Sequence, residues 1–353
     1  MESDDISALG WDAIDSALKP IYEGQVPKHY GTVISYQLGG PDPLQGISAY
    51  KRLAPVPHWH YITYGFSELY DKKSQNKAIS GWGFELTFRL KTEASSEEPP
   101  AWVLNFLQNL ARYVFQSGRV FQCGDYMNAN GPIATEVNTK IRSIAFAPDP
   151  ELPTIETPNG RVQFIQVVGT TDDEELAIKQ WATLKALGIF QQHLPLLVTD
   201  LDRDSLLAKP DVKQALQEGA SSDGSNTSAL FIDQLSWKEE RRLLRPSLIQ
   251  ITRGARQVVE LVSLLPYRIP YQRPFELVGQ ECQVAVNPSE TNGYRSELNN
   301  LKLDMSAQSA AELAASLQPK EGLYEFPSFP TLRIQVKKSC IKDQAGNVVN
   351  TIG

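Results

Sequence analysis

Residues 84–91 read Phe84-Glu85-Leu86-Thr87-Phe88-Arg89-Leu90-Lys91 and alternate strictly between apolar and polar side chains. Successive side chains of a β-strand point to opposite faces of its sheet, so this period of two predicts a strand with one apolar and one polar face. We expect the polar face to be exposed. Gly81 and Gly83 stand just before the strand and predict a tight turn or a bulge there.

Two amphipathic helices are predicted on the C-terminal side of this strand. The first follows the polar loop 93–100 and ends at Gly118; its apolar face is marked by Val103, Phe106, Leu107, Leu110 and Val114. The second follows a strand at 162–168. It starts with a capping box of Thr171 and Glu174 and continues at helical spacing to Gly188. A buried strand is then expected at 194–199.

The residues before the central strand predict one more helix and two more strands. Ile6, Leu9, Ile14 and Leu18 recur at helical intervals, and Pro20 is expected to end that helix. Strands are expected at 32–38 and 61–66, separated by the turn-rich segment 39–43. A mixture of strands and helices along the chain favours an α/β or α+β lobe.

A lobe boundary is predicted at the polar loop 221–228, which reads Ser-Ser-Asp-Gly-Ser-Asn-Thr-Ser. The charge changes here as well: residues 1–220 hold 19 Lys and Arg against 27 Asp and Glu, a net charge of −8, whereas 221–353 hold 15 against 14, a net charge of +1. We therefore expect an N-terminal lobe at 1–220 and a C-terminal lobe at 221–353. Strands at 248–252, 275–286 and 332–336 should surround an Ala-rich helix at 307–317 in the second lobe.

Composition is typical of a globular cytoplasmic protein. The chain has 353 residues, 41% of them hydrophobic, and no apolar run reaches the roughly 18 residues that a membrane span needs. The N-terminus is acidic where a secretory signal would be basic. The three cysteines, Cys123, Cys282 and Cys340, are far apart and predict reduced thiols.

The net charge of −7 disfavours nucleic acid and anionic membranes as partners. An acidic surface steers basic proteins toward itself, so a cationic protein partner fits this charge better. Solubility alone explains the same acidic excess equally well.

Two clusters of potential metal ligands stand out in the sequence. His58 and His60 would share one face of a strand, but no nearby cysteine or HExxH motif completes a metal site, so a hydrogen-bonded structural pair is favoured. The acidic run 200–204 resembles the start of a calcium loop. Its sixth position holds Ser205 where the sharp turn requires glycine, so we predict solvated carboxylates instead.

The sequence holds no GxSxG elbow, Walker loop, GxGxxG motif or catalytic Cys–His signature. We therefore predict no catalytic residues, no cofactor and no enzymatic activity. A metal-dependent hydrolase that uses His58, His60 and carboxylates without a local signature stays open as an alternative.

Several long motifs, in a consistent order, together resemble the Suppressor of fused domain across about residues 10–228. These motifs are Gly10-Trp11-Asp12-Ala13-Ile14-Asp15, Leu38-Gly39-Gly40-Pro41-Asp42-Pro43-Leu44, His58-Trp59-His60-Tyr61-Ile62, Gly83 to Leu90, Leu110 to Ser117, Gly124-Asp125 and Asp223-Gly224-Ser225-Asn226. The C-terminal third resembles the family only loosely.

The resemblance implies an α+β fold of two lobes, each with a mixed or antiparallel sheet and packed helices, with a cleft between them. Animal members of the family hold an extended segment of a Gli-type transcription factor in this cleft by added strand pairing. Carried over to this chain, the partner-binding residues would be Tyr113, Phe121, Asp125, Ala229, Leu230, Phe231 and Ile232. Backbone hydrogen bonds would supply affinity, and Asp125 would accept hydrogen bonds from the peptide.

The chain departs from animal members in ways that change the expected partner. It runs almost directly from Trp237 to Leu248, where animal members carry a long insertion, and Ala147-Pro148 replaces an acidic position of their cleft. This compact form resembles bacterial members, which are linked to polymorphic toxin systems. We therefore expect a bacterial immunity protein that neutralises a toxin by binding, and the acidic residues of 1–220 fit a basic toxin. The alternative is a scaffold that sequesters a transcription regulator.

Overall fold

The computed structural model describes residues 8–34, 36–243, 246–342 and 347–353, so Ile6 of the predicted first helix lies outside the described residues. The chain forms two compact units. Unit 1 comprises residues 1–175 and 183–213, and unit 2 comprises 176–182 and 214–353. Within the described ranges, no helix combines the length and the apolar character needed to cross a membrane.

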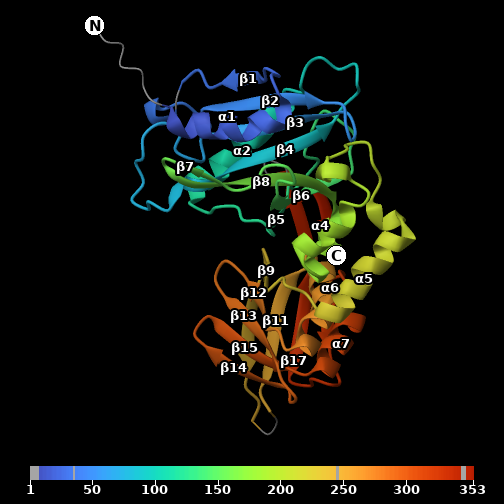
Figure 1. The fold of residues 1–353 in the computed structure, drawn as a ribbon. Coiled ribbons are helices and arrows are strands. Elements are labelled where there is room, and N and C mark those ends of the chain that lie inside the picture. The colour runs from blue at the N-terminus through green and yellow to red at the C-terminus, as the bar shows by residue number, and fades with distance from the viewer. Residues whose placement is uncertain (1–7, 35, 244–245, 343–346) are drawn as a thin grey trace. The chain divides into compact units, whose positions relative to one another are not determined.

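Unit 1 is built on one mixed sheet of eight strands (Figure 1). The strands are β1 (Lys28–Gly31), β2 (Gly46–Arg52), β3 (His58–Tyr64), β4 (Ile79–Lys91), β5 (Tyr126–Asn128), β6 (Ile141–Pro148), β7 (Ile155–Thr157) and β8 (Gly160–Thr171). Their spatial order is β1-β2-β3-β4-β8-β6-β5, and β7 pairs with β8. β4 and β8 run parallel, and the other neighbours run antiparallel.

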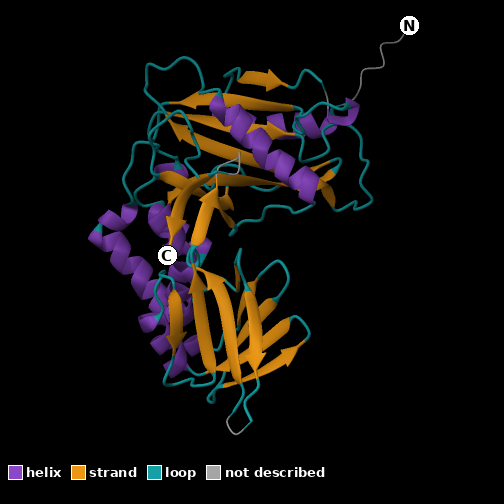
Figure 2. Ribbon diagram, turned by 180° about the vertical axis from the view of Figure 1, so that it is seen from behind, coloured by secondary structure: helices purple, strands orange, loops and turns teal. Residues whose placement is uncertain are grey.

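Helices cover both faces of this sheet (Figures 1 and 2). α1 (Leu9–Tyr22) buries Ile14 in the same cluster as Ile62, whereas α2 (Trp102–Ser117) buries Leu107 in the same cluster as Tyr61. Tyr61 and Ile62 are adjacent in β3, so their side chains point to opposite faces. The sheet is therefore sandwiched between α1 and α2.

The predicted central strand is confirmed as part of β4, but the prediction of an exposed polar face was wrong. Glu85, Thr87 and Arg89 are each 0% exposed. Arg89 pairs with His60 across the β3–β4 ladder, and Thr87 pairs with Ile62. The polar side chains therefore lie on the face that α1 covers, where each needs a polar partner.

The predicted helices are present, with different ends. α2 is followed, as predicted, by Gly118 in the left-handed region at φ 70°, and α1 continues past Pro20 to Tyr22. The helix after the capping box is two helices, α3 (Asp172–Gln180) and α4 (Thr183–Phe190), although the Thr171 N–H does donate to Glu174 at 3.0 Å.

α5 (Pro210–Asp223) extends three residues into the predicted loop. It ends before Gly224, whose φ is 70°. α3 and α5 each carry the chain from one unit into the other.

Two segments predicted as strands adopt other conformations. The chain leaves the sheet after β1, and Tyr36–Leu38 form a 3₁₀ turn; Val33 is 99% exposed, so its β-branched side chain packs on no neighbouring strand. Pro195–Leu197 also form a 3₁₀ turn, and only Thr199 bridges to β4. Pro195 has no N–H to donate to a ladder, which disfavours a strand there.

Unit 2 contains two mixed sheets and a hairpin. The strands are β9 (Ala229–Phe231), β10 (Ser236–Glu240), β11 (Leu248–Gly254), β12 (Phe275–Val278), β13 (Gln283–Pro288), β14 (Gly293–Glu297), β15 (Asn300–Met305), β16 (Gly322–Glu325), β17 (Leu332–Lys337), β18 (Ser339–Lys342) and β19 (Val348–Ile352). One sheet has the order β10-β11-β17-β16, the other β14-β15-β13-β12-β9, and β18 pairs with β19. The strand predicted at 275–286 is two strands, β12 and β13, paired antiparallel.

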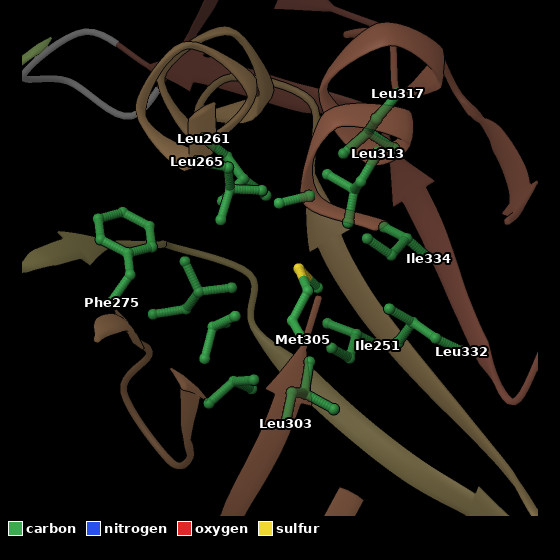
Figure 3. Close-up of a cluster of buried hydrophobic side chains, with 14 of the residues drawn as sticks. Ile251, Leu261, Leu265, Phe275, Leu303, Met305, Leu313, Leu317, Leu332 and Ile334 are labelled. Atoms are coloured by element: carbon green, nitrogen blue, oxygen red, sulfur yellow. The ribbon is translucent and has the colours of Figure 1, made fainter. Parts of the chain in front are cut away.

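Both sheets of unit 2 contribute to one core, which α6 (Val258–Leu264) and α7 (Ala307–Ser316) also line. Figure 3 shows side chains of both helices pointing toward those of the strands. α7 confirms the predicted Ala-rich helix. The chain as a whole is α+β with mixed sheets, as predicted.

Candidate partner-binding site

Three predicted contact residues lie near the end of α2 and in the segment between α2 and β5: Tyr113 is in α2, and Phe121 and Asp125 follow it. Tyr113 stacks on Phe121 with ring centroids 5.5 Å apart, and Phe121 stacks on Phe146 of β6 at 4.3 Å. Phe121 is 5% exposed and Tyr113 is 38% exposed. Phe121 is therefore part of the core of unit 1, while Tyr113, at the outer end of the stack, is available at the surface.

Asp125 is held in a tight turn directly before β5. Its Oδ2 accepts a hydrogen bond from the Gln122 N–H at 2.8 Å, and its carbonyl accepts one from the Phe146 N–H at 2.9 Å. The side chain is exposed, and among the described residues its Oδ1 has no hydrogen-bond partner. The turn thus fixes one carboxylate oxygen and leaves the other available to a ligand.

The four residues predicted from unit 2 form and follow β9, the last strand of its sheet. β9 pairs in parallel with β12, and the Ile232 N–H donates to Val278 at 2.9 Å. Leu230 and Ile232 are buried, at 6% and 2% exposed, whereas Phe231 is 68% exposed. The N–H and C=O groups of consecutive strand residues alternate in direction, so Ala229 and Phe231 direct theirs away from β12.

The structure thus brings Tyr113, Phe121 and Asp125 together in unit 1. It also places Ala229, Leu230, Phe231 and Ile232 along one sheet edge in unit 2. The sequence did not predict β5, the short strand after Asp125, which is the last strand of its own sheet. Three residues without an alternating pattern leave no strand signal, so only the fold reveals this second edge.

His58 and His60 lie on the covered face of β3, both 0% exposed. His60 Nδ1 is 2.6 Å from the Tyr22 hydroxyl, its Nε2 is 3.3 Å from Asp149 Oδ2, and His58 Nδ1 is 2.7 Å from the Val56 carbonyl oxygen. The predicted hydrogen-bonded pair therefore belongs to a buried polar network. No group of three His, Cys, Asp or Glu side chains in the described ranges is placed to hold a metal ion.

Two carboxylates of the acidic run 200–204 lie beside lysine side chains. Asp200 lies 2.6 Å from Lys91, and Asp204 lies 2.6 Å from Lys140. These distances are typical of ion pairs at a protein surface.

The buried network predicts an acid sensitivity of unit 1. Burial and the Arg89 guanidinium lower the pKa of His60 from 6.5 to about 4. A histidine whose pKa falls on folding stabilises the fold above its unfolded pKa, and this contribution is lost as the pH falls from about 6.5 to about 4. We expect His60→Gln to remove about 2–3 kcal/mol of this pH dependence.

The check is urea unfolding of wild type and His60→Gln between pH 4 and 7. Burial raises the pKa of Glu85 to about 7, so Glu85 titrates in the same range with the opposite sign. Because Glu85 is present in both proteins, it cancels in the difference between them. A difference that stays constant across this range would contradict the prediction for His60.

Residues 40–204 match the family model described as Suppressor of fused protein (SUFU). The human and mouse Suppressor of fused homologs are each 34% identical to this chain over 238 residues. The chain belongs to the Suppressor of fused family. The match covers 63% of this chain and 49% of each homolog, so the chain spans about half the length of these relatives.

Two solved Suppressor of fused structures resemble this chain. The crystal structure of Drosophila Suppressor of Fused has a TM-score of 0.77 at 24% identity and covers 94% of this chain and 97% of its own; at this identity it shows the shared fold. The Sufu-Fu complex crystal structure has a TM-score of 0.56 at 33% identity and covers 60% of this chain and 98% of its own. The family fold therefore extends beyond the segment that the family model matches.

Proposed function

We propose that this chain is a non-catalytic, cytoplasmic protein-binding protein that captures an extended segment of a partner by strand pairing. The observation that carries the proposal is the edge of β9, where the exposed Phe231 and the outward backbone groups of Ala229 and Phe231 meet. An unpaired strand edge is a template for an added strand. The similar crystal structure of the Sufu-Fu complex supports protein binding.

Tyr113, Phe121 and Asp125 are the proposed contacts on unit 1. Tyr113 offers a rigid amphipathic ring, and Asp125 offers a carboxylate oxygen held by its turn. Aromatic side chains are enriched at the energetic centres of interfaces, and carboxylates fix the register of a bound peptide through backbone N–H groups.

The partner that we favour is a toxin, which makes the chain a bacterial immunity protein. The excess of acidic residues in 1–220 supports a basic toxin because opposite charges speed the encounter of two proteins. A toxin should lose its activity at one equivalent of this chain. Capture of a transcription regulator instead would favour the regulatory scaffold.

Strand pairing predicts that Phe231→Pro weakens partner binding about tenfold or more. Proline has no N–H, so it cannot donate to an added strand, while the pairing of β9 with β12 does not use the Phe231 N–H. Proline is tolerated at strand edges, so the fold should survive. The tagged chain is used to capture partners from its native cells, mass spectrometry identifies them, and the affinity of the purified partner is then measured.

Phe231→Ala is the matched control because it removes the exposed ring and keeps the backbone N–H. Under strand pairing, the proline variant loses clearly more affinity than the alanine variant. Equal losses in both variants would assign the contact to the side chain alone. Unchanged affinity in Phe231→Pro, with an unchanged unfolding midpoint, would remove the β9 edge from the proposal.

A further inference from the structure

A pocket of about 550 Å³ lies in unit 1 beside the start of β4. It forms where Ile79 pairs with Arg161 and Phe84 pairs with Gln163, so four residues of β4 stand opposite one residue of β8. This irregularity confirms the bulge predicted at Gly81 and Gly83. Bulges re-aim side chains at sheet edges and binding sites, and volumes of about 300–1,000 Å³ are typical of binding pockets.

Glycine is required to build this bulge. Gly81 and Gly83 have φ values of 56° and 86°. A Cβ on Gly81 would lie 2.5 Å from the Phe66 carbonyl oxygen. The backbone of the bulge beside the pocket therefore depends on these glycines.

Three aromatic side chains, Trp82, Phe84 and Phe121, line the pocket, and Trp82 connects it to an exposed apolar surface. Trp82 lines the pocket and contacts Phe115 at 5.7 Å between ring centroids, and Phe115 contacts Tyr36 at 5.5 Å. In the segment around Tyr36, Val33 is 99% exposed and Leu38 is 82% exposed. An apolar surface that reaches this far beyond a pocket fits a protein segment better than a small metabolite.

Arg161 is the single charged side chain among the residues that line the pocket. Its side chain is exposed, and no described carboxylate lies within 4.0 Å of its guanidinium. Glu156, its cross-strand neighbour on β7, forms no ion pair with it either. No acidic side chain lines the pocket. The Arg161 guanidinium, beside the aromatic side chains of the pocket, complements a carboxylate that is attached to an apolar group.

We propose that this pocket receives an aromatic side chain of a partner protein while the carboxylate of an adjacent acidic residue binds Arg161. The inference rests on the proposed function in one respect, namely that the occupant is a protein. None of the residues that line the pocket belongs to β9. Phe121 is the one residue that the pocket shares with the predicted contacts of unit 1.

Cys123 reports on occupancy because it lines the pocket and is partly exposed. Burial and the nearby Asp125 carboxylate raise the pKa of this thiol to about 11, so alkylation by iodoacetamide should be slow and is followed in alkaline buffer. Peptide mass spectrometry measures each cysteine separately. The exposed Cys340 is the internal reference.

The probes are three capped dipeptides: N-acetyl-Phe-Glu-amide, N-acetyl-Phe-Gln-amide and N-acetyl-Ala-Glu-amide. We expect the Phe-Glu probe to slow alkylation of Cys123 saturably and to leave Cys340 unchanged. The Phe-Gln probe should need an about fivefold higher concentration, the upper range for one exposed ion pair. The Ala-Glu probe should slow alkylation of Cys123 least, because it has no ring to pack on the aromatic side chains of the pocket.

Arg161→Gln should abolish the preference for Phe-Glu over Phe-Gln. Glu156→Gln, a matched change on the paired strand, should keep that preference or increase it. Equal protection by the first two probes, equal protection by Phe-Glu and Ala-Glu, or no protection at all would each overturn the proposal. So would self-association of the chain that Arg161→Gln abolishes, because the occupant would then be a second copy. Strand pairing is tested separately by Phe231→Pro, so the two proposals can fail independently.

Discussion

Asp149→Ala is expected to lower the free energy of unfolding of unit 1 by about 3 kcal/mol or more. Asp149 receives hydrogen bonds from Arg89 at 2.6 and 3.1 Å and from the Thr87 hydroxyl at 2.6 Å. The side chains of Arg89 and Asp149 are both 0% exposed. Without Asp149 the guanidinium keeps Glu151 at 3.0 Å and Gln166, but it loses its fully buried counter-charge.

Urea unfolding followed by tryptophan fluorescence measures this loss, since Trp59 of β3 is 3% exposed and lies in the same sheet. Asp204→Ala is the matched control. It breaks the ion pair with Lys140, whose side chain is 70% exposed against 78% for Asp204, and should change the free energy of unfolding far less than Asp149→Ala does, because solvent screens an exposed pair. Similar losses in the two variants would contradict the role assigned to burial.

The pattern of β4 shows what local sequence can and cannot predict. Alternation at 84–91 predicts a strand because the period of two is a property of one strand. Burial of Glu85, Thr87 and Arg89 depends on α1, which lies more than 60 residues earlier in the chain, and on the loop that carries Asp149. From the sequence alone, a polar residue on one face of a strand is predicted to be exposed, because the distant residue that pairs with it in the core is not known.

The predicted contact residues show the same limit. The family motifs pointed to Tyr113, Phe121 and Asp125, and the structure shows them near the end of α2 and in the segment between α2 and β5. No local pattern indicates that Phe121 is buried while Tyr113 is partly exposed, because that difference depends on the stacking of Phe121 on Phe146. The open edge of β9 is also a product of topology, since β9 pairs with a strand about 45 residues later and ends the sheet.

The strand predicted at 32–38 is wrong because its apolar residues have no neighbouring strand to pack on. The β-branched pair Val33 and Ile34 favours a strand, yet both are exposed after the chain leaves β1. Propensity is a preference for a half-buried pleated surface, so it fails where the sheet has ended. This same exposure supplies part of the surface proposed to bind a partner.

Glu85→Ala is expected to lower the free energy of unfolding by about 3 kcal/mol or more. Glu85 is 0% exposed, and its Oε1 accepts from the Gly65 N–H at 3.0 Å and from the N–H and hydroxyl of Ser67 at 2.9 and 2.6 Å. Its Oε2 accepts from the Thr63 hydroxyl at 2.7 Å. Alanine would leave these donors buried without an acceptor.

Glu85→Gln separates the hydrogen bonds from the volume of the side chain. The amide keeps the shape and one acceptor oxygen, but its NH₂ group faces donors, so we expect a loss of about 2 kcal/mol, smaller than that of alanine. Urea unfolding of the three proteins at about pH 8.5, above the pKa of Glu85 so that its carboxyl is ionised, measures both losses. A glutamine variant as stable as wild type would show that the carboxylate fills space without organising the segment 63–67. A loss as large as that of alanine would contradict this expectation and would show that one retained acceptor oxygen does not preserve the hydrogen bonds of segment 63–67.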